Sequence, residues 1–211
     1  MISKQHLMMG EIIMEQQFNK RIITFNEYLR TMDMAIGGLG IFLRNKRKKI
    51  ISEEFSERLM LTVTEVNGCE LCSYGHTKVA LEAGISPHEI QSMLSGAGCQ
   101  YPEDESVAIF FAQHYAESGG NPDKEALSRF FQIYKKAEAE SILSVIRMIM
   151  LGNGLGIALG AIKDRLKGAP IKKSHLGREL GVIFGGFLIS PLLIIKNIFP
   201  PTRNKIRFIT S

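Results

Sequence analysis

The chain has 211 residues, of which 45% are hydrophobic and 22% charged. This balance excludes a disordered chain, and the length allows one domain whose core needs no disulfide staples. The formal net charge of +5 is modest. Its two basic stretches, 44–49 and 163–178, fit a solvated loop and a helix end, so we expect no nucleic-acid partner.

Helical signals dominate the first half of the chain, and no alternating run carries hairpin punctuation. Residues of roughly 10–43 predict one or two helices, interrupted near Gly37, Gly38 and Gly40. An apolar helix is expected over about 53–67, ended by Asn67 and Gly68. The next helix is expected from about Cys69 to Ala83, closed by Gly84.

The second half of the chain opens with the strongest helix start in the sequence. Ser86 can cap, Pro87 takes the first helical position and Glu89 the third. Further helices are expected over Glu103–Glu117, Asp123–Lys135, Glu138–Met150 and about Gly154–Leu166. The fold class predicted is therefore all-α, with short connections and antiparallel neighbours.

The C-terminal part differs in composition. Leu180–Ile195 contains no charged residue, but its helix would span only about 24 Å, and Pro191 would break or kink it. We therefore expect no clean transmembrane span. The segment is buried against the core or in a subunit interface, or it touches a membrane surface beside basic residues. We divide the chain into a helical domain, 1–175, and an apolar and basic tail, 176–211.

The cysteine usage indicates a reducing compartment. Three cysteines, Cys69, Cys72 and Cys99, do not resemble a secreted disulfide framework, and the first residues lack the apolar stretch of a signal peptide. We expect a cytoplasmic protein, with membrane association through its tail as the open alternative. In the cytosol a CxxC pair is usually catalytic or metal-binding. Cys99 is expected to be a bystander.

The residues that can carry chemistry are Cys69, Cys72 and His76, with Glu57 twelve positions before Cys69. Spacings of three and four share one helix face, and a helix N-terminus lowers the pKa of a thiol. His76 can act as a general base towards Cys72. If the two helices pack antiparallel about Asn67-Gly68, the carboxylate of Glu57 can orient the imidazole.

These groups predict a thiol redox cycle, in which a thiolate attacks a peroxide and the second thiol closes a disulfide. The choice of attacking sulfur is open on physical grounds. The helix end favours Cys69, which we expect to be the more exposed thiol, whereas the position of His76 favours Cys72. We expect Cys72 as the nucleophile and Cys69 as the resolving thiol.

The pattern Glu57…Asn67-Gly68-Cys69-x-x-Cys72-x-x-x-His76…Ala83-Gly84 resembles the core of the alkylhydroperoxidase D / carboxymuconolactone decarboxylase superfamily, and residues 152–170 resemble a later segment. The resemblance implies a helical bundle that assembles as trimers or hexamers. It also implies a peroxidatic second cysteine, a resolving first cysteine, and a proton relay through His76 and Glu57. The substrates implied are a hydroperoxide or disulfide and a dithiol reductant. Alkylhydroperoxidase D carries a further histidine where this chain has Leu71.

Three other interpretations stay open. A structural zinc site would need four ligands, and only Cys69, Cys72 and His76 lie close in sequence. The CxxC pair could be redox-sensing or non-catalytic in a protein that docks on a membrane or partner through its tail. A decarboxylase-like lyase is suggested only by the superfamily's name. We expect no cofactor and no metal.

Overall fold

A computed structural model describes residues 21–95, 101–168 and 174–198. This part of the chain contains helices and no strand, which confirms the all-α class. Cys99 lies outside the described residues, as does the beginning of the helix expected from about residue 10. The helices are α2 Phe25–Lys48, α3 Glu53–Asn67, α4 Glu70–Glu82, α5 Pro87–Leu94, α6 Glu103–Glu117, α7 Lys124–Ile133, α8 Lys136–Leu166, α9 Leu176–Leu180, the π-helical turn η1 Gly181–Gly185, and α10 Gly186–Ile198.

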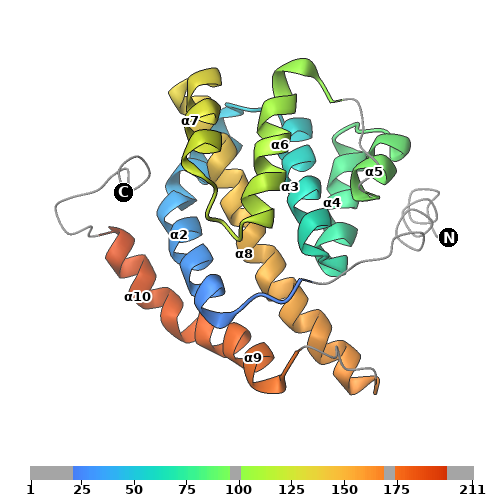
Figure 1. Cartoon of the computed structure of the whole chain (residues 1–211), viewed down its shortest axis with the longest axis vertical. Helices are drawn as coiled ribbons and strands as arrows, with labels where there is room; N and C mark the ends of the chain where they lie inside the picture. Colours follow the sequence, from blue (N-terminus) through green and yellow to red (C-terminus); the bar gives the residue numbers. More distant parts are fainter. Residues whose placement is uncertain (1–20, 96–100, 169–173, 199–211) are drawn as a thin grey trace.

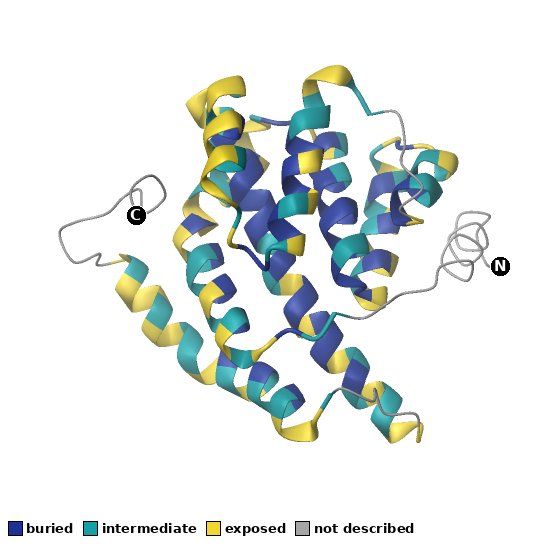
Figure 2. Cartoon of the chain, in the orientation of Figure 1, coloured by how far each residue is buried: buried dark blue, intermediate teal, exposed yellow. Residues whose placement is uncertain are grey.

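The long helix α8 forms the centre of the bundle (Figure 1). Helices α2, α3, α4, α6 and α7 all pack on it, and α9 and η1 contact it too. Its buried residues lie along its middle, whereas its C-terminal end carries more exposed positions (Figure 2). The main core joins α8 to α3 and α6 through fully buried side chains, among them Leu59, Val63, Ala112, Ile142 and Ile146.

Helix starts follow the capping residues in the sequence. The hydroxyl of Ser52 accepts from the Phe55 N–H at 3.0 Å, and that of Ser86 accepts from the Glu89 N–H at 3.2 Å. The carboxylate of Glu89 pairs with Arg58 at 2.7 Å and so links α5 to α3. The predicted helices over 53–67 and Glu103–Glu117 are confirmed at both ends.

Two predicted interruptions are wrong. Helix α2 continues through Gly37, Gly38 and Gly40, and α8 is one helix of 31 residues rather than two. Several of these glycines allow close approach instead of breaking the helix. A Cβ on Gly154 would lie 2.6 Å from the Tyr28 ring, so α2 and α8 meet at a distance that only glycine permits.

The C-terminal prediction also needs correction, because Pro191 does not end the helix. Leu176–Ile198 forms a helical run of 23 residues, about 35 Å long. Proline leaves the carbonyl of Phe187 without its usual backbone donor, and the Ser190 hydroxyl donates to that oxygen at 3.0 Å. Two described helices are long and apolar enough to cross a membrane, by length and composition alone. The most apolar window of Lys136–Leu166 is 67% buried, as suits a core helix, but that of Leu176–Ile198 is only 11% buried.

Candidate redox site

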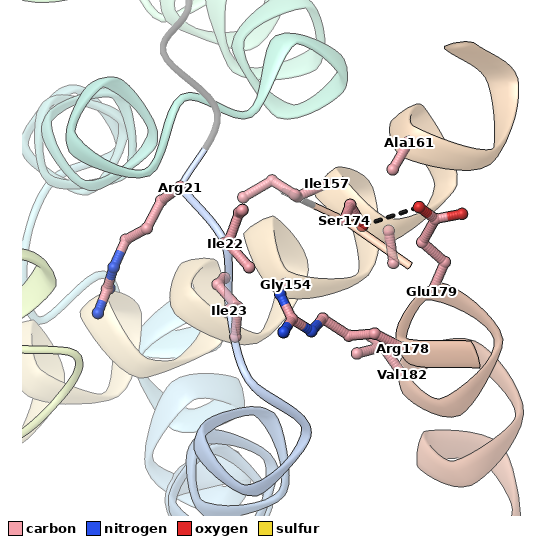
Figure 3. Close-up of a pocket in the computed structure, with 11 residues that line it drawn as sticks. Arg21, Ile22, Ile23, Gly154, Ile157, Ala161, Ser174, Arg178, Glu179 and Val182 are labelled. Atoms are coloured by element: carbon pink, nitrogen blue, oxygen red, sulfur yellow. Dashed lines mark hydrogen bonds between the residues drawn. The ribbon is translucent and has the colours of Figure 1, made fainter. Parts of the chain in front are cut away.

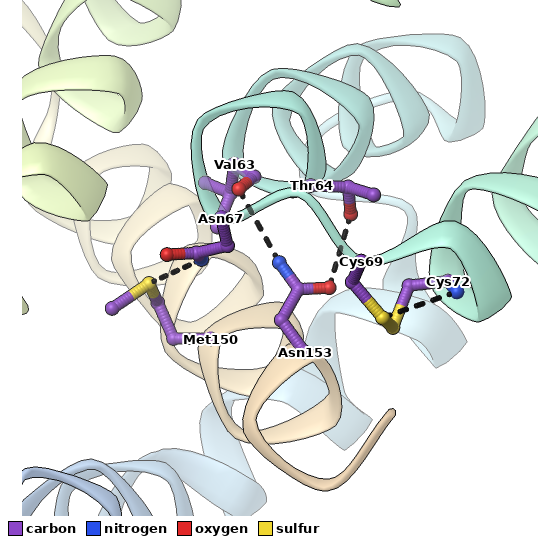
Figure 4. Close-up of a disulfide and its surroundings, with 7 residues drawn as sticks. All are labelled: Val63, Thr64, Asn67, Cys69, Cys72, Met150 and Asn153. Atoms are coloured by element: carbon purple, nitrogen blue, oxygen red, sulfur yellow. Dashed lines mark hydrogen bonds between the residues drawn. A yellow bond between two sulfur atoms is a disulfide. The ribbon is translucent and has the colours of Figure 1, made fainter. Parts of the chain in front are cut away.

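The site begins at the tight turn between α3 and α4. Gly68 ends α3 with a φ of 67°, a left-handed conformation that favours glycine. Cys69 then caps α4, and its sulfur accepts from the Cys72 N–H at 3.3 Å. The sulfurs of Cys69 and Cys72 are joined as a disulfide, with Cα atoms 5.3 Å apart (Figure 4). The turn thus places both sulfurs at the N-terminal end of α4, where the helix dipole favours a thiolate when the pair is reduced.

The packing of α3 against α4 brings Glu57 to His76. The Glu57 Oε2 lies 2.7 Å from the His76 Nδ1, within hydrogen-bond distance. The Glu57 side chain is 2% exposed, whereas 26% of the His76 side chain is exposed. A carboxylate this deeply buried requires such a partner. The contact fixes Nδ1 on the inner side of the ring and leaves Nε2 as the other nitrogen available for proton transfer.

His76 is on the same helix as the sulfurs, four residues after Cys72. Within the described part of the chain, no hydrogen bond joins His76 to either sulfur. The structure therefore forms two of the predicted pairs, Glu57 with His76 across α3 and α4 and Cys69 with Cys72 at the start of α4. Along α4, His76 lies about one turn after Cys72.

The relative exposure of the two cysteines differs from the prediction. Cys69 is only 1% exposed, because it packs inward in an apolar cluster with Ile157, Ala158 and Val182. Cys72 is the partly exposed member of the pair, beside the exposed side chain of Leu71. The expectation that Cys69 is the more accessible thiol is wrong. Cys72 is therefore the less buried residue of the pair, although it too packs against the core.

Helix α8 packs directly against the disulfide, and the sequence alone did not indicate which of its residues make this contact. A Cβ on Gly156 would lie 2.6 Å from the Cys69 sulfur and 2.8 Å from the Cys72 sulfur. One turn earlier, the Asn153 amide donates to the Val63 carbonyl at 3.3 Å and accepts from the Thr64 hydroxyl at 3.2 Å (Figure 4). In the sequence, the signal for this contact was a polar residue, Asn153, followed three positions later by Gly156 on the same face of an apolar helix.

A second carboxylate, Glu65, lies two turns beyond Glu57 on α3. Burial raises the pKa of Glu65 above its ordinary value, and the neighbouring charge of Glu117 raises it further. The Glu65 carboxylate makes no ion pair or side-chain hydrogen bond with the described residues. Only Glu57 of these two carboxylates contacts His76.

A separate small pocket of about 30 Å³ lies between the segment 21–23, α8 and α9. Its walls are mostly apolar, with Arg178 pointing across it and Glu179 held by Ser174 at 2.8 Å (Figure 3). Arg165 also pairs with Glu179 at 2.8 Å, which neutralises that carboxylate. None of the four predicted site residues lines this pocket.

Among the described residues, no group of three or more His, Cys, Asp or Glu side chains is placed to hold a metal ion. Leu71, which precedes Cys72, is exposed to solvent. No model of a protein family, no curated protein and no solved structure matches the chain. What the site can do must therefore be argued from its own geometry.

Proposed function

We propose that the protein is a thiol-dependent peroxidase or disulfide oxidoreductase that works through Cys72 and Cys69. The observation that carries this proposal is the buried Glu57 carboxylate, 2.7 Å from His76, on the helix that starts with the paired cysteines. A disulfide with only a structural role would not require an imidazole and a buried carboxylate beside it. General-base activation of a thiol requires both, one to take the proton and one to orient the base.

In the reduced enzyme, His76 accepts the proton of the Cys72 thiol. The thiolate attacks the terminal oxygen of a hydroperoxide, so the S–O bond forms as the O–O bond breaks. The leaving alkoxide takes a proton from the imidazolium and departs as an alcohol. Cys72 is then a sulfenic acid. The thiol of Cys69 attacks this sulfur, water leaves, and the disulfide forms.

A dithiol reductant closes the cycle. One of its thiolates attacks a sulfur of the Cys69–Cys72 disulfide, and its second thiol resolves the mixed disulfide. The reductant leaves as a disulfide, and both protein thiols are restored. For a disulfide substrate, the Cys72 thiolate attacks one substrate sulfur as the substrate S–S bond breaks, and Cys69 then attacks Cys72 in the mixed disulfide. The substrate leaves as a dithiol, and the same external dithiol reduces the Cys69–Cys72 disulfide that forms. Glu57 acts through His76 and not on the substrate.

The exposure of the sulfurs supports Cys72 as the nucleophile. Cys72 is partly exposed and one turn from His76, whereas Cys69 is 1% exposed and packs against the core. A buried resolving thiol is adequate because its partner, the sulfenic acid, is brought to it by the same helix turn. We extend the proposal to an alkylhydroperoxidase D-like bundle that acts in the cytoplasm as trimers or hexamers, on the strength of the residue pattern described above.

The test is hydroperoxide consumption by the full chain, with dithiothreitol as reductant. We expect Cys72→Ser to reduce the rate to the background of free thiol. Reduced Cys69→Ser, freed of dithiothreitol before the assay, should consume one equivalent of hydroperoxide and then stop with Cys72 as a sulfenic acid. Cys99→Ser is the matched control and should keep full activity. If the Cys72→Ser variant consumes hydroperoxide at the wild-type rate, the proposal is refuted.

A binding role with a non-catalytic or redox-sensing cysteine pair is the second candidate. The burial of Cys69 and the exposed helix Leu176–Ile198, which the redox chemistry does not use, favour it. This role predicts that the Cys69–Cys72 disulfide can form and be reduced, but that the protein does not catalyse the consumption of peroxide.

A lyase activity that survives the loss of both cysteines would instead support the decarboxylase-like alternative.

A further inference from the structure

The helical run α9–η1–α10 leaves one continuous apolar face uncovered. Successive members are three or four residues apart, except for the adjacent Phe187 and Leu188, so together they cover one broad face of the helix. We name this face the outer stripe, and its exposed side chains are Phe184 at 60%, Phe187 at 77%, Leu188 at 71%, Leu192 at 66%, Ile195 at 57% and Ile198 at 64%. Scattered exposed apolar residues are ordinary, but a contiguous face of this kind marks an interaction surface.

The opposite face of the same run is held closely against α2. A Cβ on Gly185 would lie 2.7 Å from the Phe25 ring, and one on Gly186 would lie 2.8 Å from the Tyr28 ring. Further along, Lys196 pairs with Asp33 at 2.7 Å. The run is therefore packed along its length, and its exposed positions lie away from the bundle (Figure 2). Its orientation, with the outer stripe outward, is fixed by the fold.

Charge distinguishes between the possible occupants of the outer stripe. No charged residue lies within Leu180–Ile195, and Lys196, half exposed, follows directly. The end of α2 beyond this point carries the exposed basic residues 46–49. Apolar side chains alone suit a protein interface as well as a bilayer, so the cations beside the stripe favour an anionic bilayer as its occupant. A bilayer needs only apolar side chains with flanking cations.

We propose that the outer stripe is a membrane-docking surface that lies in the plane of an anionic bilayer. Its large apolar side chains enter the boundary of the acyl chains, while Lys196 and the basic end of α2 meet the headgroups. The run is long enough to span a bilayer, but spanning would carry the attached α2 and its Asp33–Lys196 pair into hydrocarbon. If the run lies in the plane of the interface, α2 and the Asp33–Lys196 ion pair stay outside the hydrocarbon.

The chain contains no tryptophan, so a single introduced indole reports its own surroundings. We expect Phe187→Trp to show a blue-shifted emission with vesicles of phosphatidylcholine and phosphatidylglycerol. The matched control is Phe110→Trp on α6, where the native ring is 62% exposed, and it should not shift. Phe184→Trp and Ile195→Trp should be quenched to the same degree by shallow brominated lipids. Unequal quenching would overturn the in-plane arrangement, because in a spanning helix the two positions would differ in bilayer depth by about 16 Å.

Vesicle co-sedimentation supplies an independent measurement. Phe187→Glu with Leu192→Glu should weaken binding at least about tenfold, and pure phosphatidylcholine or high salt should weaken wild-type binding. Phe110→Glu with Ile133→Glu changes two similarly exposed apolar residues elsewhere and should leave binding intact. A Phe187→Trp shift that depends on protein concentration without vesicles would assign the stripe to a second copy of this chain. That result, or the absence of vesicle binding, would refute the proposal.

Discussion

Gly156→Ala should make the Cys69–Cys72 disulfide easier to reduce. The added Cβ would lie 2.6 Å from the Cys69 sulfur and 2.8 Å from the Cys72 sulfur, where ordinary contact begins at 3.4 Å. The disulfide cannot yield, so α4 and α8 must separate by several tenths of an ångström, at a cost of about 1–3 kcal/mol. Free thiols can rotate away from the methyl group. The cost therefore falls mainly on the oxidised form, and the reduction potential should rise by about 20–60 mV.

The potential is measured by equilibrating each variant with glutathione buffers and counting the disulfide fraction by mass spectrometry. Urea unfolding of the oxidised form gives the stability cost separately. Gly152→Ala is the control, because it changes another glycine of α8 that has nothing within 4 Å of the new Cβ. It should leave the potential unchanged and raise stability by about 1 kcal/mol. If Gly156→Ala leaves both the potential and the stability at wild-type values, α8 does not confine the sulfurs.

Three further variants test the surroundings of the site. Glu57→Gln should slow the reaction of Cys72 with hydroperoxide by about 100-fold in single-turnover kinetics, because the base loses its orienting charge; an unchanged rate would remove Glu57 from the relay. Asn153→Leu leaves the Thr64 hydroxyl without its acceptor and removes the side-chain donor to the Val63 carbonyl, and should lower the free energy of unfolding in urea by about 1–3 kcal/mol; a neutral result would show that the Thr64 hydroxyl finds another partner. Burial raises the pKa of Glu65, so stability falls as pH rises through the ordinary value of 4.5 towards the folded value. Glu65→Gln should therefore stabilise the protein at neutral pH but not below about pH 4, and equal effects at both would refute this.

Local signals predicted the helices wherever capping chemistry decides the boundary. Ser52, Ser86 and the left-handed Gly68 each begin or end a helix as their side chains or backbone require. The proximity of Glu57 to His76 was also accessible, because a short turn at Gly68 forces α3 and α4 to pack against each other. These inferences need only neighbours along the chain.

Inferences that depend on distant neighbours failed. The sequence predicted a break between Met150 and Gly154, yet α8 runs on without one, and Gly154 and Gly156 fit against Tyr28 and the sulfurs, which lie more than eighty positions away. Cys69 looked exposed as the first residue of a helix, but α8 and η1 cover it. In both cases tertiary contact reversed a local preference. Pro191 was predicted to break or kink the tail helix, and here the compensation is local: the helix continues, and the Ser190 hydroxyl donates to the carbonyl that the proline leaves without a backbone donor.

The attack of the Cys72 thiolate on a peroxide is tested most directly by trapping the first product. The Cys69→Ser variant is reduced, treated with one equivalent of cumene hydroperoxide in the presence of dimedone, and mapped by mass spectrometry. Without its resolving thiol, Cys72 should accumulate as sulfenic acid and carry the dimedone label, whereas Cys99 should not. Label absent from Cys72, or no greater on Cys72 than on Cys99, would contradict the assignment of this site as the reacting centre.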